Sequence, residues 1–363
     1  MNQQNDNLSQ ISVVSQETSM RITSLRFLLA IFVVFIHNNL TADIAINYYH
    51  LDFVEPVIIT WIKILVCNIL GGAAVPLFFM FAGYLQFKKK DIYPVLLKKK
   101  AKSLFVPYVI WTLLGVAIFF IGQSVPQLSS FFQNEVNNVS KWKVINWLNI
   151  FWVHIDVYPL ISQFWFVRDL MVIILISPLL KFLASKFPSL IITALILCYV
   201  NGLPLGFGTA LFFYMCGLFF AEYDVDFFNF SDKISWIELI CLLSLKMVFT
   251  ISFNEKVNLF GLETIISCIF FLKLSSFIIS KSKLYSFSKY LSDFSFFLYA
   301  IHMPFLVTVL EKISFRVIPL HGIGCLIQFV LPAVIAIVLG TAIGITLKKI
   351  CLPLFALLNG GRK

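Results

Sequence analysis

Two basic side chains, Arg26 and His37, lie eleven residues apart in the first apolar stretch of the chain, SLRFLLAIFVVFIHNNL. Hydrocarbon does not tolerate idle polar groups, so an Arg or a His within a membrane-spanning helix indicates a functional site. At about 100° per residue, eleven steps come within about 20° of three full turns, so both side chains share one helix face. The axial rise between them is about 16 Å. This face therefore carries a permanent cation towards one end and a titratable imidazole towards the other.

Further ionisable residues with possible chemistry lie inside other apolar stretches. Arg168 and Asp169 adjoin each other in QFWFVRDLMVIIL, and His302 lies in FSFFLYAIHMPF. Such residues are costly in a bilayer and mark reaction or transport paths. Each also has a structural interpretation, because Arg168 and Asp169 would form an ion pair that stiffens helix packing, and His302 a hydrogen bond between helices. Arg26 near a helix start would snorkel to lipid phosphates.

The elements that must position these residues are transmembrane helices. Of the 363 residues, 60% are hydrophobic and only 13% are charged, whereas soluble domains carry about 25% charged residues. Runs of about twenty apolar residues flanked by lysines are typical of membrane spans. The seven cysteines form no CxxC pair and lie mostly in such runs, which indicates packing residues rather than disulfides or a metal site. The sequence therefore predicts an all-α, polytopic transmembrane helix bundle.

We expect a membrane domain over residues 22–350, between a cytoplasmic N-terminal tail (1–21) and a cytoplasmic C-terminal tail (351–363). Its long outer loop is expected at about 123–162, where three tryptophans suit a short helix at the level of the lipid headgroups. About ten spans are expected, near 22–40, 64–87, 103–122, 163–183, 188–201, 205–222, 235–252, 258–279, 292–311 and 322–347.

The distribution of basic residues predicts the orientation of these spans. With both termini in the cytoplasm, inside segments hold 18 lysines and arginines and outside segments hold 5, which is the asymmetry expected of a membrane protein. The net charge of +10 follows mostly from this bias and does not indicate nucleic-acid binding. In this orientation Arg26 lies near the inner face, whereas His37, Arg168, Asp169 and His302 are expected at similar depth nearer the outer face.

An Arg, ten residues and a His in the first span, here Arg26 and His37, form a signature that resembles the acyltransferase type 3 family of integral membrane O-acyltransferases. The resemblance covers nearly the whole chain. PLFFMFAGYLQFKKK is similar to a family stretch at the end of the second span, although Ala82 replaces the usual Ser before Gly83. FWFVRDL and FSFFLYAIHMPF resemble the family's mid-chain and late spans, and the latter contributes Tyr299.

The inner loop KKKAKSLFVPY is similar to a basic pair that precedes a proline in this family, with Lys99 and Lys102 where arginines are usual. Lysine binds phosphate as a point charge and lacks the bidentate fork of arginine. The resemblance implies that the phosphates of a cytosolic acyl-CoA, most often acetyl-CoA, meet Lys98, Lys99, Lys100 and Lys102, together with Arg26, at the inner face.

The resemblance also implies the reaction, in which an acyl group passes from acyl-CoA to a hydroxyl of an extracytoplasmic or lipid-linked glycan without a metal. His37 is expected to act as a general base or to carry the acyl group transiently. Arg168 would stabilise the oxyanion or orient the acceptor, with Asp169 holding it. Tyr299 and His302 would position either substrate.

The resemblance implies a multi-pass protein of the cytoplasmic (inner) membrane whose partners are acyl-CoA, a glycan acceptor and the bilayer. A transporter or flippase that uses an intramembrane histidine as a proton relay is the main alternative. The sequence has no evident internal repeat, which disfavours an inverted-repeat transporter. A purely structural membrane protein would leave the alignment of Arg26 with His37 unexplained.

Overall fold

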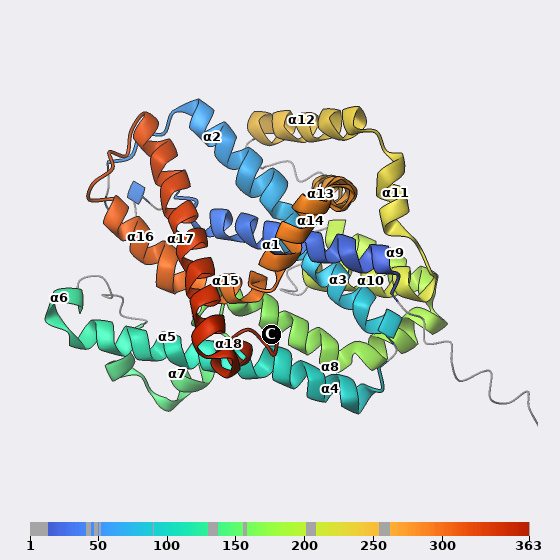
Figure 1. Cartoon of the computed structure of the whole chain (residues 1–363), viewed down its shortest axis with the longest axis horizontal. Coiled ribbons are helices and arrows are strands. Elements are labelled where there is room, and N and C mark those ends of the chain that lie inside the picture. Colours follow the sequence, from blue (N-terminus) through green and yellow to red (C-terminus); the bar gives the residue numbers. More distant parts are fainter. Residues whose placement is uncertain are drawn as a thin grey trace, which may run out of the picture. The chain divides into compact units, whose positions relative to one another are not determined.

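The computed structural model describes residues 14–40, 45–46, 50, 52–89, 91–129, 137–154, 158–200, 208–253 and 262–362, which are almost entirely helical (Figure 1). The only strand-like pairing among them is an isolated bridge between Val54 and His321. The predicted all-α class is confirmed. Most of the expected N-terminal tail (1–13), parts of the expected outer loop (130–136 and 155–157) and the ends of some expected spans lie outside the described residues.

Within the described ranges, five helical segments are long and apolar enough to cross a membrane: Gln16–His37, Val57–Lys89, Tyr93–Ser124, Ser295–Ser314 and Ile323–Ile350. Three helix pairs meet the same criteria together but bend by 117°, 91° and 116°: Ser162–Lys186 with Pro188–Tyr199, Phe227–Lys233 with Trp236–Ser252, and Thr264–Ser280 with Ser282–Ser292. The chain is thus a polytopic helical membrane protein with five to eight candidate spans and one shorter apolar helix, Gly208–Glu222.

The difference from about ten expected spans has a local cause. The ranges 163–183 and 188–201 were expected to be separate spans, but they are two arms of one bent pair. The bend falls at Pro188, which cannot donate a helical hydrogen bond and disfavours helical geometry in the residue before it. An apolar pattern predicts helical arms in such a region but not the angle between them.

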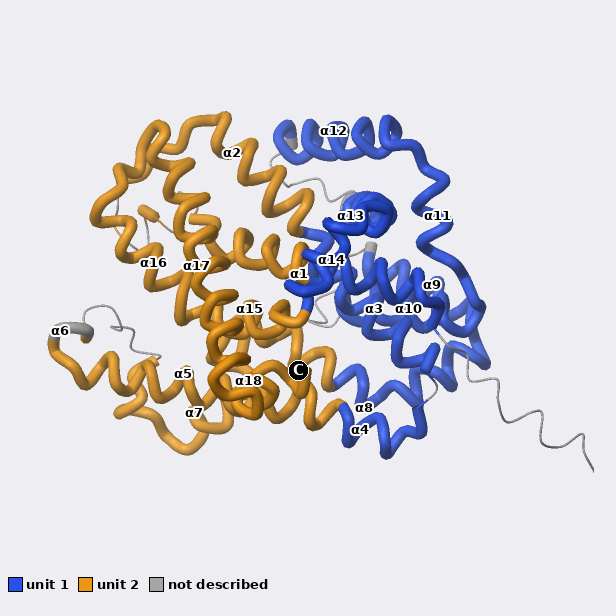
Figure 2. Tube along the Cα trace, viewed as in Figure 1, with its two compact units in different colours: residues 1–26, 72–99, 172–292 blue, residues 27–71, 100–171, 293–363 orange. Residues whose placement is uncertain are grey.

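The chain divides into two compact units, coloured blue and orange in Figure 2. Unit 1 comprises residues 1–26, 72–99 and 172–292, and unit 2 comprises residues 27–71, 100–171 and 293–363. Two helices of central interest begin in one unit and end in the other: α1 (Gln16–His37) and α8 (Trp165–Lys186).

Unit 1 is built around two helices whose backbones touch, α3 (Ala74–Lys89) and α10 (Gly208–Glu222). A Cβ atom on Gly83 would lie 2.2 Å from the carbonyl oxygen of Tyr214, and one on Gly217 would lie 2.1 Å from that of Met80. Small residues allow such close approach between membrane helices. The other helices of unit 1 are α4 (Tyr93–Lys100), α9 (Pro188–Val200), α11 (Phe227–Lys233), α12 (Trp236–Phe253), α13 (Leu262–Ser280) and α14 (Ser282–Ser292).

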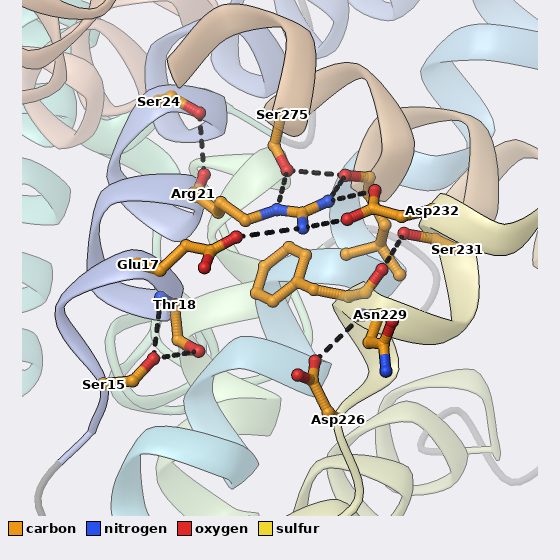
Figure 3. A network of polar contacts seen from close by, with 12 residues as sticks. Ser15, Glu17, Thr18, Arg21, Ser24, Asp226, Asn229, Ser231, Asp232 and Ser275 are labelled. Atoms are coloured by element: carbon orange, nitrogen blue, oxygen red, sulfur yellow. Dashed lines mark hydrogen bonds and ion pairs between the residues drawn. The ribbon is translucent and has the colours of Figure 1, made fainter. Parts of the chain in front are cut away.

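Arg21 holds the first half of α1 in unit 1 (Figure 3). Its guanidinium donates to both carboxylate oxygens of Asp232 at 2.6 and 2.8 Å, and its Nε donates to Ser275 Oγ at 2.8 Å. A further bond reaches the carbonyl of Leu272, and the guanidinium lies 4.3 Å from the ring centre of Phe228. Arginine suits this role because its planar fork fits a carboxylate and an aromatic face together.

This position of Arg21 differs from the expected cytoplasmic tail over residues 1–21. The helix begins at Gln16, six residues before the expected span, and Arg21 is only 1% exposed. The reason is the N-terminal cap, in which Ser15 Oγ accepts a hydrogen bond from the backbone N–H of Thr18. The first apolar residue therefore does not mark the start of the helix.

Unit 2 contains the second half of α1 together with further helices. They are α2 (Val57–Lys63), the π-helix η3 (Ile64–Leu70), η5 (Ala101–Phe105), α5 (Val106–Ser124), α6 (Pro126–Ser129), η6 (Val139–Lys141), α7 (Val144–Asn149), η7 (Ser162–Phe164), α15 (Ser295–Ile301), η8 (His302–Leu306), α16 (Val307–Ser314), α17 (Ile323–Ile350) and α18 (Leu352–Leu358). Helix α17 packs on α15 through Gly340 and Gly344, where added Cβ atoms would lie 3.0 Å from Leu298 and 3.1 Å from Phe297.

The described parts of the expected outer loop are packed rather than extended. Val139, Ile150 and Leu160 form a buried cluster with Val116 of α5. Gln123 at the end of α5 accepts a hydrogen bond from the backbone N–H of Val139 at 3.1 Å. The short helix expected near the tryptophans is present as α7. This packing fixes the segment that leads into η7 and α8.

Candidate active site

His37 is the last residue of α1, and its ring is held by the end of its own helix. Its Nδ1 lies 2.8 Å from the carbonyl oxygen of Val33, one turn earlier in the helix. A carbonyl only accepts, so Nδ1 must carry the proton in this bond. The negative end of the helix dipole also favours a cation here. In neutral His37 the other ring nitrogen, Nε2, therefore bears the lone pair.

His302 faces the protonated nitrogen of His37. Its Nε2 lies 3.3 Å from His37 Nδ1, and the two rings meet edge-on at a centroid distance of 5.0 Å. His302 Nδ1 lies 2.7 Å from the carbonyl oxygen of Tyr299, so this nitrogen carries the proton and Nε2 accepts from His37. His302 is fully buried. The pair fixes the tautomer of His37 and directs its reactive Nε2 away from His302.

A break in the late span sets the position of His302. Helix α15 ends at Ile301, and Met303 has non-helical backbone angles, φ −124° and ψ 141°. Gln163 Nε2 donates to two carbonyl oxygens next to this break, that of Met303 at 2.5 Å and that of Ala300 at 3.4 Å. A break inside a membrane helix requires such partners, because lipid offers none.

The backbone of Gln163 is also a hydrogen-bond partner of Tyr299 on α15. The hydroxyl of Tyr299 donates to the backbone carbonyl of Gln163, and Gln163 Nε2 donates to the carbonyl of Ala300, so α15 and η7 are joined by bonds in both directions. Gln163 is 1% exposed. Gln163 was not among the residues selected from the sequence, although its side chain is an amide and it begins the apolar stretch that contains Arg168.

Arg168 and Asp169 form a buried pair at the start of α8. Arg168 Nε donates to Asp169 Oδ1 at 2.8 Å, and its NH1 donates to the carbonyl oxygen of Trp152 at 2.6 Å. The guanidinium also lies 5.4 Å from the ring centre of Trp152. Asp169 is fully buried, and its Oδ2 has no hydrogen-bond partner among the described residues. Through Phe166 of α8, whose ring centre lies 6.0 Å from that of Tyr299, this helix also contacts α15.

Unit 2 therefore contains five of the residues selected from the sequence: His37, Arg168, Asp169, Tyr299 and His302. Arg26 lies on the same helix as His37 but in the half that belongs to unit 1. It is half-buried and ten residues from the helix start, so it lies mid-helix rather than at the expected inner end.

The lysine-rich segment is helical rather than an inner loop. Helix α4 continues through η5 into α5, so Tyr93–Ser124 is one helical segment. Nothing in KKKAKSLF breaks the helix, and Pro107, which has no N–H to give to the preceding turn, lies just after the π-helix η5. The side chains of Lys98, Lys99 and Lys102 are exposed and that of Lys100 is half-buried.

A family model matches nearly the whole chain. The model of a family described as an acyltransferase domain matches residues 21–349. The chain belongs to the acyltransferase 3 family. Membership identifies an enzyme that transfers acyl groups, as the resemblance predicted. It therefore favours an acyltransferase over the transporter alternative.

A curated relative gives this acyltransferase 3 protein a biological context. The chain is 27% identical over 217 residues to the succinoglycan biosynthesis protein ExoH of Rhizobium meliloti (strain 1021). The match covers 57% of this chain and 55% of ExoH, so it spans about half the length of that relative. No solved structure matches the chain.

The histidine pair leads to a testable expectation for this acyltransferase. Replacing His302 by leucine should lower kcat by about 10- to 100-fold, because a bond that supports a charged His37 is worth about 1.5–3 kcal/mol. Gln in place of His302 keeps an acceptor oxygen and should retain more activity than leucine. Steady-state kinetics on both purified variants would test this, and equal activities for leucine and glutamine would contradict the assigned hydrogen bond.

Proposed function

We propose that this protein is an integral membrane O-acyltransferase that moves an acyl group, preferably acetyl, from cytosolic acyl-CoA to a hydroxyl of an extracytoplasmic or lipid-linked glycan. The observation that carries the proposal is the state of His37. Its Nδ1 proton is held by Val33 and His302, which leaves Nε2 as the base. The acyl-transferring family supplies the reaction class.

In the proposed reaction, His37 Nε2 takes the proton of the acceptor hydroxyl as its oxygen attacks the thioester carbonyl carbon. The bond between that carbon and sulfur then breaks, and the imidazolium returns the proton to the leaving thiolate of CoA. The positive charge that His37 carries in between is stabilised by the Val33 carbonyl and by His302 Nε2. Arg168, oriented by Asp169, would stabilise the negative charge on the carbonyl oxygen.

The donor is proposed to bind from the cytoplasmic side. Lys98, Lys99, Lys100 and Lys102 form a cationic stretch that suits the phosphates of CoA. Along α1, Arg26 and His37 are separated by about 16 Å, a length suited to an extended pantetheine arm. These assignments rest on the proposed orientation, with both termini in the cytoplasm and the protein in the cytoplasmic membrane.

The glycan acceptor is proposed from the relative. ExoH is named for succinoglycan biosynthesis, and this chain matches it over about half of each protein. A polysaccharide hydroxyl also suits a site with a histidine base and buried polar groups, because hydroxyls need both deprotonation and orientation.

The direct test uses the purified protein in lipid nanodiscs with radiolabelled acetyl-CoA and chemically de-O-acylated envelope polysaccharide from the host. We expect base-labile label on the polysaccharide and stoichiometric release of CoA, with mass spectrometry identifying the ester. Acetyl transfer only to amines, or none to any glycan fraction, would overturn the proposal.

Charge reversal in the lysine stretch tests the donor site. The double variant Lys99→Glu and Lys102→Glu should raise KM for acetyl-CoA by about tenfold or more, since each reversal replaces an attraction for phosphate of about 1 kcal/mol by a repulsion. Lys141→Glu with Lys143→Glu is a matched control, because both lysines are exposed and lie in the segment proposed to be outside. An equal KM for acetyl-CoA in both double variants would indicate that these lysines determine only the orientation of the protein in the membrane and do not bind the donor.

A further inference from the structure

Helix α17 contains a proline, Pro332, that removes a helical hydrogen bond close to Asn38, the residue after His37. Pro332 lies inside this helix and has no N–H, so the carbonyl of Gln328 loses its normal helical donor. Asn38, the residue after His37, supplies one instead. Its Nδ2 donates to the carbonyl oxygens of Gln328 at 3.2 Å and of Phe329 at 2.6 Å.

This bond fixes which way the amide of Asn38 points. Only the NH₂ group can donate to the two carbonyls, so the oxygen Oδ1 must face the other way. Asn38 is 1% exposed, and its Oδ1 has no hydrogen-bond partner among the described residues. The side chain of Gln328 is 3% exposed, and neither its Oε1 nor its Nε2 has a partner in the described part of the chain.

Three buried polar atoms thus lie on two residues that touch, and one of the two, Asn38, directly follows His37 in the chain. Each unsatisfied buried group costs about 1–3 kcal/mol. Groups of this kind are rare in native proteins and expensive in a bilayer, where they mark substrate paths. The bond to the carbonyls beside the Pro332 break accounts for the Nδ2 group of Asn38. It leaves Asn38 Oδ1 and the side-chain amide of Gln328 without a partner among the described residues.

The chemistry of these atoms selects the kind of ligand. They comprise two oxygen acceptors and one NH₂ donor, which suit hydroxyl groups because a hydroxyl both donates and accepts. A phosphate would meet two acceptor oxygens. The nearby cation does not favour an anion either, since Lys63 donates to the Leu40 carbonyl and is paired with Glu55.

We infer that Asn38 and Gln328 form a subsite that binds hydroxyl groups of the acceptor sugar next to His37. The inference rests on the proposed function and adds the residues that select the acceptor. Gln328 lies on the buried face of α17 together with Gly340 and Gly344, the residues that pack on α15. The subsite is therefore built into the same helix packing that carries His302.

The test replaces Gln328 by methionine, which keeps the length of the side chain and removes its hydrogen bonds. With de-O-acylated host polysaccharide as acceptor, Gln328→Met should raise the acceptor KM about tenfold, the equivalent of one to two hydrogen bonds. The KM for acetyl-CoA should not change. Gln86→Met is the matched control, because Gln86 is a buried glutamine of unit 1 with one unpartnered oxygen.

A second readout makes the assignment specific. Methyl glycosides that each lack one hydroxyl should be poorer acceptors for the wild type, and for one position this penalty should vanish in Gln328→Met. If Gln328→Met does not fold, Gln328→Glu keeps the shape and should show the same loss of acceptor affinity. An unchanged acceptor KM in a folded, active variant would overturn the subsite, whereas a wild type that acylates no glycan would overturn the proposed function instead.

Discussion

Replacing His37 by alanine should lower acyl transfer by about 10²- to 10⁴-fold, the usual contribution of a positioned general base. The reason is that this ring is fixed by Val33 and His302 in a tautomer with a basic Nε2. No other described histidine than His302 adjoins it, and His302 uses its own Nε2 to accept from His37. The rate of CoA release in the presence of acceptor measures the effect.

The matched control is His321→Ala, which removes an exposed histidine of unit 2. This variant should retain wild-type kcat, and both variants should elute as folded protein in detergent. Normal transfer by His37→Ala would refute the assigned base. Incubating the wild type with acetyl-CoA alone separates the two possible mechanisms, because an acetyl group found on His37 by mass spectrometry would show a covalent intermediate instead of base catalysis.

The second large effect concerns folding rather than chemistry. Gly217→Ala should destabilise unit 1 because the new Cβ would lie 2.1 Å from the Met80 carbonyl oxygen and 2.6 Å from the Tyr84 nitrogen. Alanine gains about 1 kcal/mol of helix propensity over glycine. Overpacking costs about 1–3 kcal/mol and occasionally more. Backbone atoms cannot rotate away, so we expect the clash to outweigh the gain.

Gly72→Ala provides the comparison with the same chemical change. A Cβ on Gly72 meets nothing within 4 Å, so this variant should be tolerated. Thermal unfolding of the detergent-solubilised proteins should show a lower Tm for Gly217→Ala alone. If both variants unfold at the wild-type temperature, α3 and α10 do not pack as closely as their glycines indicate.

Much of this fold follows from local pattern. The apolar runs predicted helices at nearly all the positions where they occur. An isolated Arg, Asp or His in such a run selected the candidate site residues, whose roles stay predictions. Helix α1 begins before the range expected for the first span because its cap residue, Ser15, precedes the apolar run. The capping pattern at Ser15 and Thr18 was present in the sequence and would have moved Arg21 into the helix.

The candidate site was harder to predict because its contacts are not local. His37 and His302 are 265 residues apart in sequence, and no periodicity relates them. Gln163 was overlooked because its role depends on a break at Met303, which an apolar pattern does not reveal. Residue type could nominate members of the site, but only the packing of α15, η7 and α1 could pair them.

The hydrogen bonds from Asn38 to the break in α17 predict that two positions vary together among members of this family. Pro332 leaves the Gln328 carbonyl without a helical donor, and an amide 290 residues earlier in the chain supplies one. Losing either residue alone harms the protein, since an unmatched carbonyl or a redundant buried amide results. Positions 38 and 332 should therefore change together among relatives, so that a relative without the proline can also vary the residue that follows the proposed base, His37.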